Sequence, residues 1–368
     1  MTVENALIAL PDETEQHQRF APGTEFWQQN AYTFVGASSG MDFMLFTKVC
    51  VVAGREGGQW PHVGERVEHT TELIMLPSDR RGSMADHNFI ASGIHPHQLR
   101  EKSELSVTES ADAVRWSIEG RVYEATSGNW HVRGEHGGVD LDLIFTPILP
   151  PLWPWGRTDD PTLKPIWYDT MCAVSGTIAV AGKTYPIDGT GIREHMTVGP
   201  HINNIANNAP YDPIYWDYLV SPDISVWFFR YPGPGQDLAF VRLDGEDIQY
   251  TSGQITHTVI EHWADRRSGL SFPCKWNLVL ASPRGTLVLD IAAHGRSFLP
   301  WVMTPGIRLE IWMLGTGNGV FHHPDGTRTV IEDQLMVINP LQFLTYAEEN
   351  LDGTMPQLPH APAAATTN

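Results

Sequence analysis

The chain has 368 residues, of which 42% are hydrophobic and 18% charged, so it is long enough for two domains and apolar enough to bury large cores. Its formal net charge of −19 argues against nucleic acids and anionic membrane surfaces as partners, because both carry phosphate. The N-terminal sequence MTVENALIALPDETEQ has no basic start, and no apolar run approaches the ~18–20 residues of a membrane helix. We therefore expect no signal peptide, no membrane insertion and a cytoplasmic protein.

In chain order, short runs that alternate apolar and polar residues are separated by Gly, Pro, Asn and Asp. This period of two predicts antiparallel strands in an all-β sandwich or barrel. Ala181-Gly182 and Asp244-Gly245 predict hairpin turns. The expected strand-forming segments are 41–54, 66–77, 113–126, 139–151, 172–191, 224–233 and 238–253.

The segment PILPPLWPWGRTDDPTLKP, residues 147–165, is rich in proline and tryptophan. We expect it to join an N-terminal β-barrel of residues 20–165 to a C-terminal β-barrel of residues 166–345. The remainder, 346–368, has low complexity and is predicted to be a disordered tail. The sequence does not determine whether the chain forms a homo-oligomer.

The three cysteines, Cys50, Cys172 and Cys274, are odd in number and far apart. Their spacing favours neither a disulfide framework nor a CxxC metal site, and we expect each to be a small buried residue of a strand. This usage fits a reducing cytoplasm.

A first polar candidate is IHPHQLRE, which contains His95, His97 and Glu101. The HxHxxxE spacing is one that cupin barrels use to bind a metal, because residues i and i+2 share one face of a strand. The proline between the two histidines instead favours a solvated loop. Metal binding and a plain loop both stay open.

Two lone acids stand among aromatic residues, Asp169 in WYDTMC and Asp217 in YWDYLV. On a strand, alternation sends Trp216 and Tyr218 to one face and Asp217 to the other. Either acid could face solvent. Alternatively, an acid in an aromatic cavity holds a proton at neutral pH because burial raises its pKa, and Tyr168, Trp216 and Tyr218 would then line that cavity.

The stretch TGIREHMTVGPHINN concentrates charge between glycines, with Arg193, Glu194 and His195 consecutive and His201 shortly after. The glycines predict a bend after the strand GKTYPID. The simplest interpretation is an exposed charged turn with a local ion pair. The functional interpretation is a carboxyl oriented by the histidine, with the arginine holding a neighbouring polar group.

GTGIREHMTVGPH resembles the G-(aromatic)-H-D-H-N-W-G element of carotenoid 1,2-hydratases, and the G-x-x-R-[DE]-H-x-W-G element of related bacterial proteins of mostly unassigned function. That group has a lipocalin-like, calycin-type fold of two consecutive β-barrels. This chain has one extra residue before Gly199, and Thr197 or Val198 stands where the group has tryptophan.

The resemblance implies a cofactor-independent hydratase, dehydratase or isomerase that acts on an apolar, isoprenoid-like substrate. Glu194 matches the catalytic aspartate of the hydratases, and His195 matches the histidine after it, which implies a proton donor and its orienting partner. Two alternatives stay open: a non-enzymatic carrier of hydrophobic small molecules, and a cyclase that works by shape alone. The full candidate set is Arg193, Glu194, His195 and Asp217 for catalysis, and Tyr168, Asp169, His201, Trp216, Tyr218 and Trp227 for substrate binding.

Overall fold

The computed structural model describes residues 23–56, 58, 60–81, 84, 89–90, 99–154, 166–199, 214–221, 223–230, 237–265, 269–303 and 306–346. These residues form two antiparallel β-sheets, interrupted by three single turns of 3₁₀-helix at Ser78–Arg80, Lys102–Glu104 and Ser252–Gln254. The expected all-β fold class is confirmed. No helix in the described ranges is long and apolar enough to cross a membrane.

The first sheet has twelve strands in the order β4-β3-β2-β1-β12-β11-β10-β9-β8-β7-β6, with β5 paired to β3. Its strands are β1 (Phe26–Ser38), β2 (Met41–Gly54), β3 (Gly64–Pro77), β4 (Phe89–Ile90), β5 (Leu99–Glu101), β6 (Ser106–Glu109), β7 (Ala113–Ile118), β8 (Arg121–Thr126), β9 (Asn129–His136), β10 (Val139–Pro147), β11 (Ile166–Val180) and β12 (Lys183–Val198).

The second sheet has nine strands in the order β16-β15-β14-β13-β21-β20-β19-β18-β17. Its strands are β13 (Ile214–Val220), β14 (Ser225–Arg230), β15 (Leu238–Leu243), β16 (Glu246–Thr251), β17 (Ile255–Ala264), β18 (Ser271–Ser282), β19 (Gly285–Met303), β20 (Gly306–His322) and β21 (Arg328–Tyr346).

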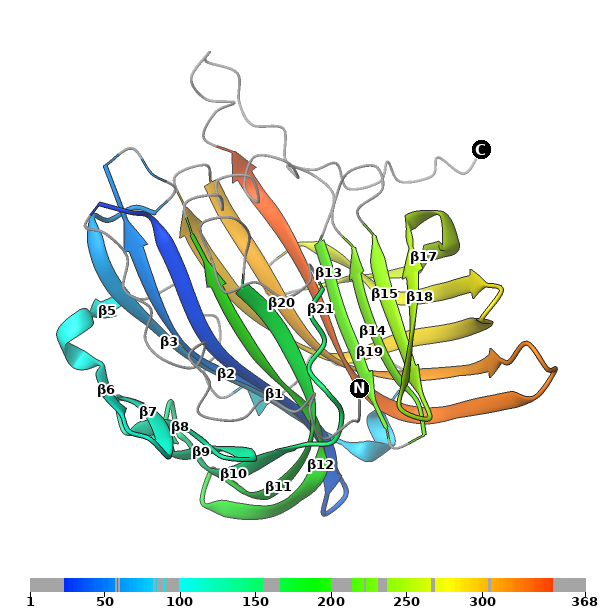
Figure 1. Cartoon of the computed structure of the whole chain (residues 1–368), viewed down its shortest axis with the longest axis horizontal. Helices are drawn as coiled ribbons and strands as arrows, with labels where there is room; N and C mark the ends of the chain where they lie inside the picture. Colours follow the sequence, from blue (N-terminus) through cyan, green and yellow to red (C-terminus); the bar gives the residue numbers. More distant parts are fainter. Residues whose placement is uncertain are drawn as a thin grey trace.

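The first sheet curls into a half-barrel, and the second sheet stands beside it (Figure 1). Strand β10, which lies between β11 and β9, alternates between buried and exposed residues along its length, as a strand with one solvent-exposed face requires. Strand β1, by contrast, is buried without a break from Phe26 to Gly36, because both of its faces are covered. The centre of each sheet is therefore a place where polar side chains can be buried on either face.

The apolar side chains form three cores. One fills the curl of the first sheet and contains Tyr123 and Trp130, and another fills the second sheet and contains Trp276. The remaining core draws on both sheets, with Trp27 and Trp167 from the first and Trp216 from the second. This shared core lies between the two sheets and surrounds the candidate site.

Several local predictions are confirmed. The turns at Ala181-Gly182 and Asp244-Gly245 both have positive φ angles, as two-residue hairpin turns between right-twisted strands require. All three cysteines are buried in strands, on β2, β11 and β18, and have free thiols.

The strand break expected around Gly189 and Gly191 is wrong, because β12 is one continuous strand from Lys183 to Val198. A Cβ atom at Gly191 would lie 2.2 Å from the carbonyl oxygen of Thr33 on the neighbouring strand. The glycine therefore permits a close approach of β12 to β1 rather than a turn.

The sheets divide the chain after Val198, whereas we expected a domain boundary at residue 165. Strands β11 and β12, residues 166–198, pair within the first sheet, since β12 lies between β1 and β11. Pairing between the N-terminal strand and one more than 150 residues later is a long-range contact that local periodicity does not encode.

Candidate active site between the two sheets

A cavity lies in the shared core, with walls from β1, β2, β11 and β12 on one side and from β13, β14, β19, β20 and β21 on the other. It contains about 670 Å³ of empty volume, including the part that opens to solvent. Most of its lining is aromatic or aliphatic, and five indoles contribute to it: Trp27, Trp167, Trp216, Trp301 and Trp312. Such walls suit a largely apolar ligand.

Glu194 supplies a carboxyl group to the wall of this cavity. It stands on β12 in register with Ala31 of β1 and Asp169 of β11, and only 3% of its surface is exposed. Its Oε1 accepts a short hydrogen bond from Nε2 of Gln29. The Oε1 of Gln29 in turn accepts a 3.1 Å hydrogen bond from the indole of Trp27, which fixes the orientation of the amide.

Burial raises the pKa of Glu194 well above its usual range, because the charged form loses its hydration. The neighbouring carboxyl groups of Asp169 and Glu310 raise this pKa further, whereas Lys48 and the hydrogen bond from Gln29 lower it. These effects together favour the protonated form of the Glu194 carboxyl, which is the form that can act as an acid.

Asp169 stands directly beside Glu194 on β11, and its carboxyl is also buried. It accepts hydrogen bonds from two indoles, Trp227 at 2.7 Å and Trp167 at 3.2 Å. Burial raises its pKa to about 7, against the lowering effect of these bonds and of the Arg193 charge. Two acids on one face thus disfavour each other's ionisation.

The remaining charged groups of the cavity are held in pairs. Lys48 forms a buried ion pair with Glu68 at 3.1 Å, and its ammonium lies 3.8 Å from the centre of the Trp301 ring. Glu310 accepts a 2.8 Å hydrogen bond from the Trp301 indole and lies 3.9 Å from the Arg308 guanidinium. Because these charges are compensated, the cavity presents no strong net field to a ligand.

Two indole N–H groups in the cavity wall, those of Trp216 and Trp312, have no hydrogen-bond partner among the described residues. A buried N–H without a partner loses free energy relative to its hydrated state. An oxygen atom on a bound ligand would supply the missing acceptor.

His195 and Arg193 flank Glu194 in sequence and therefore point to the opposite face of β12. His195 Nδ1 donates to Asn30 Oδ1 at 2.9 Å, and its ring stacks on Tyr168 with centroids 5.3 Å apart. Arg193 also donates to Asn30 Oδ1, at 2.6 Å. Gln29, rather than His195, thus holds the Glu194 carboxyl, and Tyr168 faces the core of the first sheet rather than the cavity.

The interpretation of the REH motif as an exposed turn is wrong, since all three side chains are at most 3% exposed. The corresponding solvated interpretation of Asp169 and Asp217 is wrong for the same reason, because both faces of β11 and β13 are covered at these positions.

Asp217 lies on the far side of β13 from the cavity. Alternation along β13 directs Trp216 and Tyr218 to the shared core and Asp217 to the core of the second sheet, as the sequence predicts. Its Oδ1 accepts a 3.1 Å hydrogen bond from the backbone N–H of Asn339, and burial raises its pKa to about 7. The structure thus separates Asp217, a catalytic candidate from the sequence, from Glu194.

Tyr218 and Trp227 both lie in the shared core. Burial raises the pKa of the Tyr218 phenol well above its usual range, and the nearby carboxyl groups of Asp169 and Glu194 add to this effect. Trp227 contacts the site through its hydrogen bond to Asp169.

Three predicted residues, His95, His97 and His201, lie outside the described residues. Glu101 is exposed on β5 and forms an ion pair with Arg66 at 3.4 Å.

Most of the residues that line the cavity were missed by the sequence analysis, among them Gln29, Lys48, Glu310 and Trp312. The first three share a signal that was available, namely polar residues next to aromatic or aliphatic ones in a strand-forming segment, as in FWQQN, LFTKV and RLEIW. Trp312 has no such signal, because tryptophans of the cavity and of the cores look alike in sequence.

Comparisons with known proteins bear on the fold. No family model matches the chain, and no curated protein matches its sequence. Among solved structures, a protein assigned as AttH from Nitrosomonas europaea superposes with a TM-score of 0.60 at 12% identity, covering 92% of this chain and 97% of its own.

Kievitone hydratase from Nectria haematococca gives a TM-score of 0.52 at 11% identity, with 94% of this chain and 95% of the hydratase covered. CghA gives 0.52 at 10% identity, with coverages of 92% and 97%. The chain thus shares its overall architecture with these proteins along nearly its whole length.

Proposed function

We propose that the cavity between the sheets is the active site of a cofactor-independent hydratase, dehydratase or isomerase of apolar, isoprenoid-like (terpenoid) small molecules, with Glu194 as the proton donor. The observation that carries this proposal is a buried carboxyl group, with its pKa raised by burial, on the wall of an aromatic cavity. The architecture shared with kievitone hydratase supports it at the level of the fold.

In the hydration direction, Glu194 gives its proton to one alkene carbon, and the π bond becomes the new C–H bond. The adjacent carbon becomes a cation, which the faces of the surrounding indoles stabilise without reacting. Water then forms a C–O bond to that carbon and loses a proton to the Glu194 carboxylate, so the acid is restored. Dehydration runs these steps backwards. Loss of a different carbon-bound proton from the cation gives an isomerised alkene.

The residues around Glu194 have separate roles in this proposed mechanism. Gln29 orients the carboxyl, and burial together with Asp169 raises its pKa. The indole N–H groups of Trp216 and Trp312 are available to the oxygen of an alcohol or of the attacking water. Arg193 and His195 act from the other face of β12, where they hold Asn30 of β1 and are positioning residues at most.

The experiment is to incubate the purified protein with a panel of prenyl alcohols and alkenes in ¹⁸O-labelled water and to analyse the products by mass spectrometry. Glu194→Gln is the test variant, because it keeps the shape of the side chain and removes the acidic proton. Labelled alcohol, or loss of water from an alcohol, that disappears in the variant supports the proposal.

Two outcomes would contradict it. Conversion that is unchanged in Glu194→Gln removes the acid from the mechanism and favours a cyclase that works by shape. Retention of a ligand without conversion favours a carrier of hydrophobic small molecules, with the aromatic cavity as its binding site.

A further inference from the structure

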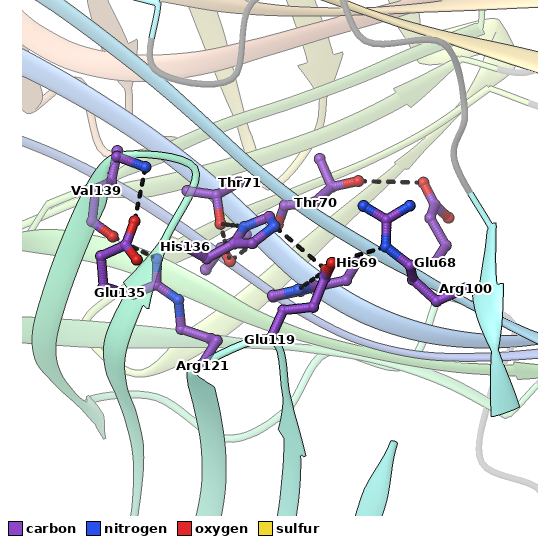
Figure 2. Close-up of polar contacts among 12 residues, drawn as sticks. Glu68, His69, Thr70, Thr71, Arg100, Glu119, Arg121, Glu135, His136 and Val139 are labelled. Carbon is purple, nitrogen blue, oxygen red and sulfur yellow. Dashed lines mark hydrogen bonds and ion pairs between the residues drawn. The ribbon is translucent and has the colours of Figure 1, made fainter. Parts of the chain in front are cut away.

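A second cluster of reactive side chains lies on the first sheet, away from the cavity. It consists of His69 on β3, Glu119 in the turn between β7 and β8, and His136 at the end of β9 (Figure 2). Its members come from nearly opposite ends of the sheet order, and the curl of the sheet brings them together. Glu68, which precedes His69, points to the other face and pairs with Lys48 of the cavity, so the two sites are separate.

The three side chains converge on one carboxylate oxygen. Glu119 Oε2 lies 3.0 Å from His69 Nδ1 and 3.5 Å from His136 Nε2, and the two imidazole rings have centroids 3.8 Å apart. Ligand atoms at 2.0–2.2 Å from a tetrahedral metal ion are separated from each other by about 3.3–3.6 Å. The 3.5 Å separation lies in this range and the 3.0 Å separation is slightly shorter, so a small shift of Glu119 would place these atoms on one face of a tetrahedral coordination shell.

The outer nitrogen of each imidazole has a hydroxyl partner that holds the ring in place. His136 Nδ1 lies 2.9 Å from the Thr71 hydroxyl, and His69 Nε2 lies 3.0 Å from the Tyr123 hydroxyl. From Tyr123 the chain continues to Thr47 at 2.7 Å and ends on the carbonyl oxygen of Thr70. A bound cation would take the place of the proton between His69 Nδ1 and Glu119 Oε2, while the Tyr123 and Thr71 hydroxyls hold the two rings at their outer nitrogens.

The charges of the cluster suit a metal ion. Glu119 contributes a carboxylate oxygen beside two imidazole nitrogens, and this donor set suits a divalent transition-metal ion. Arg100 binds the other oxygen, Oε1, at 2.7 Å and leaves Oε2 to the histidines.

Solvent reaches one side of the cluster. The His69 side chain is fully buried, whereas those of His136 and Glu119 are 17% and 25% exposed. Water can therefore occupy a fourth position on a bound ion.

We propose that His69, Glu119 and His136 form a binding site for a divalent transition-metal ion of the Zn²⁺ class, which links the ends of the first sheet across its curl. Two nitrogen donors and one carboxylate oxygen favour such an ion over Mg²⁺ or Ca²⁺, which prefer oxygen ligands. The site lies outside the proposed active site, and its role is to stabilise the fold.

The test is a titration of the chelator-treated full chain with Co²⁺, followed by its visible absorption, and with Zn²⁺, followed by calorimetry. We expect one equivalent to bind with the absorption of four-coordinate Co²⁺, and the midpoint of thermal unfolding to rise by several degrees. Glu119→Gln and His136→Gln should each weaken binding at least tenfold, with circular dichroism used to show that each variant is folded.

The matched control is His131→Gln. His131 contacts Asp142 at 2.6 Å on the same sheet, but this exposed pair lies outside the three-ligand cluster. Its loss should leave Co²⁺ binding unchanged. Absence of binding at millimolar Co²⁺ and Zn²⁺ would overturn the proposal and leave a hydrogen-bonded cluster that shares a proton. Binding that persists in Glu119→Gln and His136→Gln would overturn it as well, because the ion would then sit elsewhere.

Discussion

Glu194 and Asp217 are both buried acids at the centre of a sheet, and burial raises the pKa of each. Their surroundings differ. Glu194 borders a cavity and has acidic neighbours, whereas Asp217 is packed inside the second sheet and accepts a backbone hydrogen bond. A perturbed pKa alone therefore does not mark a reactive group in this protein, and space for a substrate beside the acid is the second requirement.

The largest expected effect is on turnover. We expect Glu194→Gln to lower kcat by about 10²–10⁴-fold, the usual contribution of a general acid. Asp217→Asn should leave kcat within about threefold of wild type, because its side chain does not reach the cavity. The measurement is the initial rate of both variants on the first substrate that the labelled-water panel identifies. Equal losses in the two variants would mean that turnover reports on stability rather than on proton transfer.

The next largest effect is on the free energy of unfolding and arises from the ionisation of Asp217. Its pKa is about 7 in the folded protein against 3.8 in the unfolded chain, so the folded state binds the proton more tightly. The stability that this proton provides is fully present below pH 3.8 and is lost as the pH rises through 7. The shift corresponds to at most about 4 kcal/mol between pH 4 and pH 8.

Asp217→Asn removes this titration while keeping an oxygen for the Asn339 N–H. Relative to wild type, the variant should therefore gain a few kcal/mol of unfolding free energy between pH 4 and pH 8, measured by urea denaturation at several pH values. Parallel curves for the two proteins would show that Asp217 ionises freely in the fold.

A smaller effect, on the pH–rate profile, distinguishes Asp169, which lies beside Glu194, from Asp217, which does not. Above pH 7 the Asp169 carboxylate raises the pKa of Glu194. Asp169→Asn removes that charge, so the pKa of Glu194 falls and the alkaline limb of the pH–rate profile moves to lower pH, with kcat at pH 8 reduced severalfold. Asp217→Asn should leave the limb in place. A limb that moves to higher pH in Asp169→Asn would assign it to another group.

The comparison of Glu194 with Asp217 also shows how much of this site can be predicted from the sequence. Alternation and turn residues predict the strands and the opposite orientations of Trp216 and Asp217, because both depend on neighbours in the chain. The resemblance of the REH element singles out Glu194. The sequence does not determine whether Asp169 and Asp217 are exposed. A strand that is covered on both faces and a strand with one solvent-exposed face differ only in what packs against them.

The partners of Glu194 could not be predicted, because they arrive through pairing over long distances. Gln29 reaches it from a strand 165 residues earlier, and Glu310 comes from the second sheet. The local pattern favoured His195 as the partner, but residues adjacent in a strand point to opposite faces.

The smallest effect concerns two buried tryptophans, one that borders the cavity and one that does not. Trp312 and Trp276 are both buried, and neither indole N–H has a hydrogen-bond partner among the described residues. Trp312 borders the cavity, whereas Trp276 lies in the core of the second sheet. If the Trp312 N–H binds a ligand oxygen, Trp312→Phe removes one hydrogen bond, worth about 1 kcal/mol or roughly a fivefold rise in Kd.

Trp276→Phe is the matched control, since it makes the same chemical change where no ligand reaches. It should lower the unfolding free energy through lost packing and leave Kd unchanged. Equilibrium binding of an oxygenated ligand and of its hydrocarbon analogue separates the two contributions, because only the oxygenated ligand should be sensitive to Trp312→Phe. Equal weakening for both ligands would mean that Trp312 contributes surface rather than a hydrogen bond, and the oxygen would then have to be held by the Trp216 side of the cavity.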